Sequence, residues 1–207
     1  MLLTLIPAYG LFLLAVMSPG PDFIMTVQMS VRHGARAGMA TALGIALANL
    51  IHIAYVHIGI GALIAHSLLA FSILKLLAAA YLIYLGYKAL RSRTGTTDIN
   101  LDAQQAQTAS LRKAFGQGFI TNALNPKAAI FWLSYLTIVV DPAMPPALLW
   151  SFIALLLLTA FIWFSLVAYF LTRQAIRQQF MRCGHWFDRA MGLLLVGLGI
   201  KVALASR

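Results

Sequence analysis

Two short stretches, each with helix-breaking proline and one charged residue, interrupt the apolar part of this chain. The first comprises Ser18, Pro19, Gly20, Pro21 and Asp22. The second comprises Asn122, Asn125, Pro126 and Lys127. Proline lacks an amide hydrogen and clashes with the preceding helical turn, so both stretches should release backbone polar groups from helical hydrogen bonding. Released backbone groups beside a charge, in apolar surroundings, are typical of a binding site for a small polar molecule or an ion.

The two charges themselves are the strongest candidates for chemistry. Asp22 is the only acid well inside an apolar segment, and it could bind an ammonium group, carry a proton or form a static pair with Lys127. Lys127 is the matching candidate for a substrate carboxylate. Each charge directly follows a proline, at the same offset in the two stretches. We therefore predict that the two side chains lie close together in the fold.

Four neutral or weakly basic residues accompany them. Asn122 and Asn125 could cap the interrupted helix, because asparagine accepts hydrogen bonds from free amides, or they could contact a ligand. Asn49 and His52 are three residues apart and share one helix face. His52 could line the pathway or carry protons. A role in packing or in hydrogen bonding between helices fits His52 equally well.

The composition places these residues in a membrane. Of 207 residues, 61% are hydrophobic and 10% are charged, whereas roughly a quarter of a soluble domain is charged. The formal net charge is +10, but the basic residues separate apolar runs and form no stripe, which favours topology determinants over nucleic-acid binding. The single cysteine, Cys183, has His185 nearby but no further ligand partners. We predict no metal and no cofactor.

The apolar segments predict an all-α membrane helix bundle. About 20 apolar residues span a bilayer, and six segments qualify. They are residues 3–29, 38–65, 68–90, 116–140, 146–172 and 190–205. The proline stretches fall in the first and fourth segments. A polar cytoplasmic linker, 94–113, divides the single domain 1–207 into two repeats, 1–93 and 114–207. Three spans per repeat would make the copies inverted, a common transporter architecture.

The basic residues also predict the orientation. Most of the 15 lysines and arginines lie around the connections between spans one and two, three and four, and five and six. The connection between spans one and two carries Arg32 and Arg36. The positive-inside rule places these connections in the cytoplasm and both termini in the periplasm. The competing model has five spans, with the N-terminus inside. Residues 1–10 lack a basic residue, so we expect no cleavable signal peptide.

Two motifs resemble those of the LysE/RhtB family of amino-acid exporters. They are Met-Ser-Pro-Gly-Pro-Asp-Phe at 17–23 and Thr-Asn-Ala-Leu-Asn-Pro-Lys-Ala at 121–128. The resemblance covers the whole chain and is greatest to the threonine and homoserine exporters of the family. It implies export of amino acids across the bacterial inner membrane, driven by the proton gradient. The motifs are specific for the family and do not specify the substrate.

The residues and the resemblance together predict a secondary transporter, not an enzyme. A small neutral amino acid needs one acid and one base, and Asp22 and Lys127 provide them. A basic amino acid, the alternative cargo, would require another acid within the spans. A channel is a second alternative, and an intramembrane enzyme a third. The expected partners are the amino acid, protons and lipid. A homodimer is compatible with so small a bundle, although the sequence shows no specific interface motif.

Overall fold

The computed structural model shows helices throughout the part of the chain that it describes. It describes residues 2–66, 68–91, 110–139, 144–173, 175–176, 186, 189–190, 192–197, 199–200 and 203–204. The helices are α1 (Leu2–Met17), α2 (Pro21–His33), α3 (Ala35–His66), α4 (Leu68–Leu90), α5 (Leu111–Ala123), α6 (Pro126–Val139) and α7 (Pro146–Phe170). The described residues contain no strand. The all-α prediction is therefore confirmed for these residues.

Several of these helices suit a membrane. Among the described residues, two helical stretches are long and apolar enough to cross a bilayer, Ala35–Gly59 and Pro146–Phe170. The pair α1 and α2 gives a third span if it counts as one, and its two helices are bent by 53°. Most of the predicted linker 94–113 lies outside the described residues, as do five of the 16 residues of the predicted span 190–205.

The connection between α2 and α3 is shorter than we predicted. Arg32 and Arg36 were expected in a loop, but Arg32 belongs to α2 and Arg36 to α3. Gly34 alone joins the two helices, with a φ of 88° that favours glycine. Similarly, α5 begins at Leu111, so its first three residues overlap the predicted linker. These helices thus extend beyond the predicted apolar segments, through polar and basic residues.

Helices α3 and α5 cross at glycines. A Cβ on Gly44 would collide with the backbone of Phe115, and a Cβ on Gly118 would collide with the backbone of Thr41. The Thr41 hydroxyl lies 3.1 Å from the carbonyl oxygen of Ala114, to which it donates across the same crossing. Small residues allow such close backbone approach between membrane helices. This crossing fixes the position of α5, which leads into the second proline stretch.

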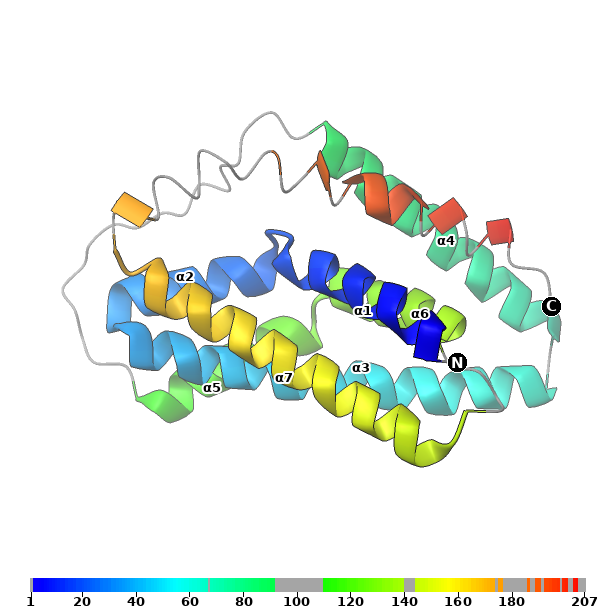
Figure 1. The fold of residues 1–207 in the computed structure, drawn as a ribbon, viewed down its shortest axis with the longest axis horizontal. Helices are drawn as coiled ribbons and strands as arrows, with labels where there is room; N and C mark the ends of the chain where they lie inside the picture. Colours follow the sequence, from blue (N-terminus) through cyan, green and yellow to red (C-terminus); the bar gives the residue numbers. More distant parts are fainter. Residues whose placement is uncertain are drawn as a thin grey trace.

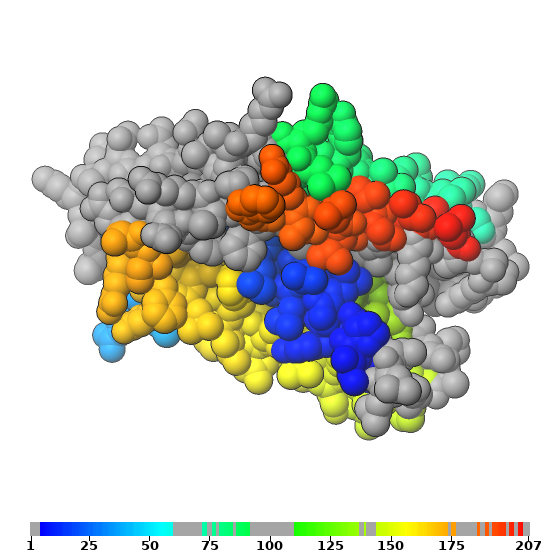
Figure 2. All heavy atoms as spheres, turned by 45° about the horizontal axis from the view of Figure 1, so that its top comes forward, coloured from blue at the N-terminus to red at the C-terminus, as the bar shows by residue number. Residues whose placement is uncertain are grey.

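A second glycine crossing joins α4 to the C-terminal part of the chain. A Cβ on Gly86 would lie 2.6 Å from the carbonyl oxygen of Gly192, and a Cβ on Gly192 would lie 2.7 Å from that of Gly86. Figure 2 shows the described C-terminal residues, in orange and red, lying along α4 in green. In Figure 1 these two segments form a layer over the helices that contain the proline stretches. Leu82 and Leu195 from this layer reach the pocket described below.

One end of the bundle gathers positive charge. Figure 1 shows that α2 and α7 end, and α3 and α5 begin, at the same end of the molecule. The basic residues at these helix ends are Arg32, Arg36, Arg112, Lys113 and Arg173. The other end holds an apolar cluster of α1, α3, α6 and α7, in which Trp132, Tyr135 and Leu156 are almost completely buried. Among the described residues, these helix ends thus form a basic end of the bundle, opposite the apolar cluster.

Candidate functional site

The first proline stretch separates α1 from α2. Helix α1 ends at Met17, and α2 begins at Pro21 after a three-residue break. Proline suits the first helical position because the amide at that position has no helical acceptor. The carboxylate of Asp22 therefore lies in the first turn of α2, where the positive end of the helix dipole stabilises it.

The second stretch separates α5 from α6 and is held by His52. Pro126 has no N–H to donate to the carbonyl oxygen of Asn122, four residues earlier. That oxygen instead accepts from the Asn125 amide at 2.9 Å and lies 2.9 Å from His52 Nε2. A carbonyl oxygen only accepts, so Nε2 carries the hydrogen. In the neutral ring Nδ1 then accepts from the Tyr55 hydroxyl, 3.0 Å away.

Asn125 caps the helix that follows the second break. Its side-chain oxygen accepts from the backbone amide of Lys127 at 3.0 Å, and its carbonyl oxygen accepts from the amide of Ala129 at 3.0 Å. This is the arrangement by which asparagine satisfies free amides at the start of a helix. The capping role that the sequence left open for Asn125 is present, and its amide nitrogen remains available for another acceptor.

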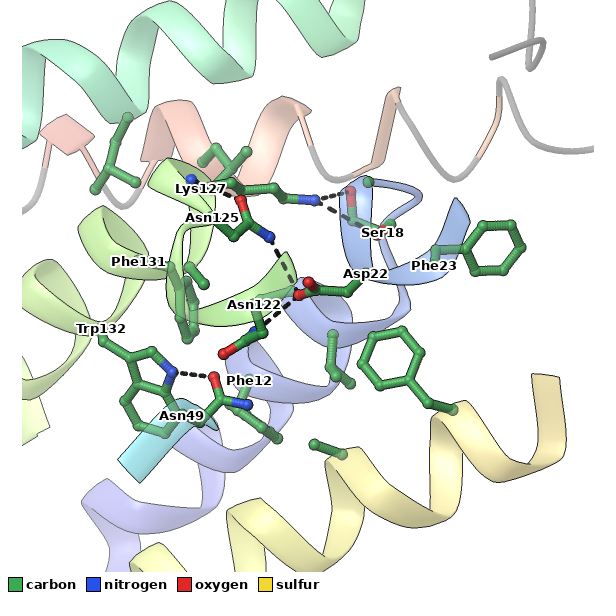
Figure 3. Close-up of a pocket in the computed structure, with 18 residues that line it drawn as sticks. Phe12, Ser18, Asp22, Phe23, Asn49, Asn122, Asn125, Lys127, Phe131 and Trp132 are labelled. Carbon is green, nitrogen blue, oxygen red and sulfur yellow. Dashed lines mark hydrogen bonds between the residues drawn. The ribbon is translucent and has the colours of Figure 1, made fainter. Parts of the chain in front are cut away.

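The charged side chain of each break contacts polar groups of the other break (Figure 3). Asp22 Oδ2 accepts from the side-chain nitrogens of Asn122, at 2.9 Å, and Asn125, at 3.1 Å. Lys127 Nζ donates to the Ser18 hydroxyl at 2.8 Å. It also lies 3.4 Å and 3.5 Å from the carbonyl oxygens of Ser18 and Pro19, at the negative end of the α1 dipole. Each break is thus held by the charge that the other supplies.

A pocket opens where the breaks meet. Its polar side is formed by Ser18, Asp22, Asn49, Asn122, Asn125 and Lys127, together with Gly20. Its apolar side is formed by Phe12, Ala15, Val16, Phe23, Leu82, Ala128, Phe131, Trp132, Ala160, Phe164 and Leu195. Asp22 and Lys127 are the only charged residues in this lining. A concave, largely apolar pocket with a few convergent polar groups is the usual form of a small-molecule site.

Asn49 lies at the pocket wall, bonded to an aromatic residue. Its side-chain oxygen accepts from the indole nitrogen of Trp132 at 2.6 Å, and its nitrogen donates to the carbonyl oxygen of Ile45 at 2.9 Å. All the hydrogen bonds that the structure gives Asn49 are thus to the protein. Because Trp132 is 1% exposed, this bond fixes the orientation of the indole ring in the wall.

The structure brings most of the predicted site residues together. Seven of them line the pocket: Ser18, Gly20, Asp22, Asn49, Asn122, Asn125 and Lys127. His52, Pro19, Pro21 and Pro126 are not among the lining residues. His52 is 1% exposed and acts on the backbone of the second break, and the prolines shape the two breaks.

Sequence reasoning missed the aromatic wall. Phe12, Phe23, Phe131, Trp132 and Phe164 come from four helices and line the pocket. One of them could have been found from spacing alone. Phe131 lies four residues after Lys127 on α6, and residues at this spacing share a helix face. The others depend on how distant helices pack.

An all-helical bundle of membrane-length apolar helices around a polar pocket is an architecture of membrane transport proteins. The LysE type translocator model matches residues 13–206, so the chain belongs to that family. The chain is 26% identical over 205 residues to the threonine efflux protein of Escherichia coli K12, covering 99% of this chain and 100% of that protein. It is 37% identical over 129 residues to the homoserine/homoserine lactone efflux protein of Salmonella typhimurium, covering 62% and 61%. No solved structure matches the chain.

Proposed function

We propose that this protein exports small hydrophilic amino acids, of the threonine and homoserine type, from the bacterial cytoplasm. The observation that carries the proposal is the pocket between two helix breaks, which contains one acid, Asp22, and one base, Lys127. Efflux proteins for threonine and homoserine are among the relatives. Proton antiport would supply the driving force, with Asp22 as proton carrier or cargo ligand.

The charges in the pocket favour neutral cargo over basic cargo. A neutral amino acid adds no net charge to a pocket that already contains one acid and one base. A lysine or arginine cargo would bring an additional cation, and the lining residues offer no second acid to compensate it. Export of basic amino acids therefore remains the second candidate within the same family.

The proposed transport mechanism requires two repeats in opposite orientation. Under this mechanism α1–α2, α3 and α4 would form the first repeat, and α5–α6, α7 and the C-terminal residues would form the second. Broken helices at corresponding places in two such repeats are typical of alternating-access carriers. The breaks would lie near the bilayer midplane, where released backbone groups must face protein or a water-filled cavity. A channel would need no such pairing.

The orientation has its own test. The end of the bundle that carries Arg32, Arg36, Arg112 and Lys113 would face the cytoplasm under the positive-inside rule. A six-span chain in this orientation has both termini in the periplasm of the bacterial inner membrane. A periplasm-active reporter fused after Arg207 is expected to be active, and a cytoplasm-active reporter at the same place inactive. The reverse pattern would reject the six-span model.

Transport itself is tested with purified protein in proteoliposomes. Vesicles loaded with a mixture of amino acids are expected to lose threonine or homoserine selectively, faster with a proton gradient, and with saturation. Asp22→Asn removes the titratable charge while keeping the side-chain shape, and should slow gradient-driven efflux roughly 10- to 100-fold, as expected for loss of a charged hydrogen-bonding group.

The matched control is Asp102→Asn, which makes the same chemical change within the predicted linker, and its efflux should equal that of the wild type. Efflux that responds neither to the gradient nor to Asp22→Asn would contradict the proposal and favour a channel. Selective loss of lysine or arginine would favour the second candidate.

A further inference from the structure

Two oxygen atoms in the pocket wall accept no hydrogen bond from the described residues. They are Asp22 Oδ1 and Asn122 Oδ1, and both atoms are buried. Asn122 as a whole is only 2% exposed. Both residues line the same pocket, and in Figure 3 the side-chain oxygen of Asn122 points away from Asp22. Buried acceptors without a donor are costly and uncommon, and they require an explanation.

The hydrogen bonds of the site explain why these two atoms remain. Both side-chain amides that reach Asp22 donate to Oδ2, which leaves Oδ1 without a donor. The nitrogen of Asn122 is used on that carboxylate at 2.9 Å. A carboxylate only accepts, so the nitrogen of Asn122 must face it and the oxygen must point elsewhere. The side-chain atom of Asn122 that lacks a partner is therefore the oxygen, because the nitrogen faces the carboxylate.

The donors in the pocket are largely committed. Lys127 Nζ donates to the Ser18 hydroxyl at 2.8 Å and lies near two backbone carbonyl oxygens. The nitrogen of Asn125 donates to Asp22, and that of Asn49 donates to Ile45. A ligand carboxylate would have to displace Lys127 from the first break. A ligand ammonium would find the charged acceptor Asp22 Oδ1 with no bond to break.

We propose, building on the proposed export function, that Asp22 Oδ1 forms an ammonium subsite that selects cargo by its primary amine, with Asn122 Oδ1 as a separate acceptor for the cargo. Under this proposal a free carboxylate on the cargo is dispensable. Small primary amino alcohols are then ligands as well as amino acids. The carbon skeleton of the ligand packs on the apolar wall, which includes Phe12, Phe131 and Trp132.

The test separates the two ends of the cargo. Binding to the purified protein in detergent is measured by the shift in its unfolding temperature with threonine, threoninol, N-acetylthreonine and 2,3-dihydroxybutanoate. Threoninol keeps the ammonium and lacks the carboxylate, whereas the last two lack the ammonium. We expect threoninol to bind within about fivefold of threonine, and the amine-free ligands to bind roughly 10- to 100-fold more weakly.

A variant tests the assigned atom. In Asp22→Asn the two asparagine amides should hold the remaining oxygen in place of Oδ2, which leaves a nitrogen donor in place of Oδ1. Threoninol affinity is expected to fall roughly 10- to 100-fold. The unfolding temperature without ligand shows whether the variant is folded. If it is not folded, the ligand series on the wild-type protein still tests the ammonium subsite.

The outcomes for this subsite and for the export function are distinct. Threonine binding with threoninol more than about 100-fold weaker would overturn the subsite and leave export intact, since carboxylate recognition would then dominate affinity. Equal binding of N-acetylthreonine and threonine, or no binding by any of the four compounds, would also overturn it. Threoninol binding without gradient-driven efflux of amino acids would support the subsite and reject the export function.

Discussion

Replacing Lys127 with glutamine is expected to lower the free energy of unfolding by roughly 1.5–3 kcal/mol, the range for losing a hydrogen bond that involves a charged group. Glutamine can still donate to the Ser18 hydroxyl, so the change removes mainly the positive charge. The carboxylate of Asp22 then has no opposite charge among the lining residues. Adding Asp22→Asn makes the pocket neutral and should restore much of the lost stability.

The two single variants and the double variant form a thermodynamic cycle. Denaturation in detergent measures the free energy of unfolding of each, and Lys113→Gln is the matched control. Lys113 lies exposed near the start of α5, where loss of a charge should change stability by no more than about 0.5 kcal/mol. If the two single effects simply add, Asp22 and Lys127 act as separate anchors without mutual stabilisation. Recovery of stability in the double variant is expected without recovery of transport.

Gly118→Ala is expected to destabilise the protein by roughly 1–3 kcal/mol or more, the cost of overpacking a tight contact. The added methyl group would meet the backbone of Thr41, which cannot rotate away as a flexible side chain can. Helices α3 and α5 would have to separate, weakening the hydrogen bond from the Thr41 hydroxyl to Ala114. Thermal unfolding in detergent, together with the yield of membrane-inserted protein, measures the effect.

Gly116→Ala is the matched control, because it lies on the same helix and a Cβ there has nothing within 4 Å. This control should be neutral or gain up to about 1 kcal/mol, since alanine favours helix more than glycine does. Equal stability of the two variants would show that α3 and α5 are able to separate at no cost, contrary to the close crossing.

The breaks were predictable because proline acts locally. Pro21 and Pro126 each begin a helix, whatever packs around them. The partners of the charges were less accessible. Asp22 and Lys127 line the same pocket, and each contacts polar groups of the opposite break that are about a hundred residues away in sequence. Such pairings depend on how whole helices cross, which local patterns do not encode.

The apolar residues of the pocket were also not predicted from the sequence. Trp132 and Phe164 look like packing residues in the sequence, since aromatic side chains on membrane helices are usually buried or interfacial. Their place in the pocket follows from the crossings of α6 and α7 with the broken helices. By contrast, α3 ends at His66 and α4 begins at Leu68, which matches the predicted boundary between the segments 38–65 and 68–90.

The single-residue corner at Gly34 has a mechanical consequence. Its amide donates to the carbonyl oxygen of Ser30 in α2, and its own carbonyl oxygen accepts from the amide of Ala37 in α3. The connection therefore contains no residue outside this hydrogen bonding. We therefore expect a tilt of α3 to move α2 with it. The first turn of α2 carries Asp22, whereas α1 is attached only through the three residues before Pro21. Movement of α3 would thus displace the carboxylate relative to α1, with residues 18–20 as the pivot.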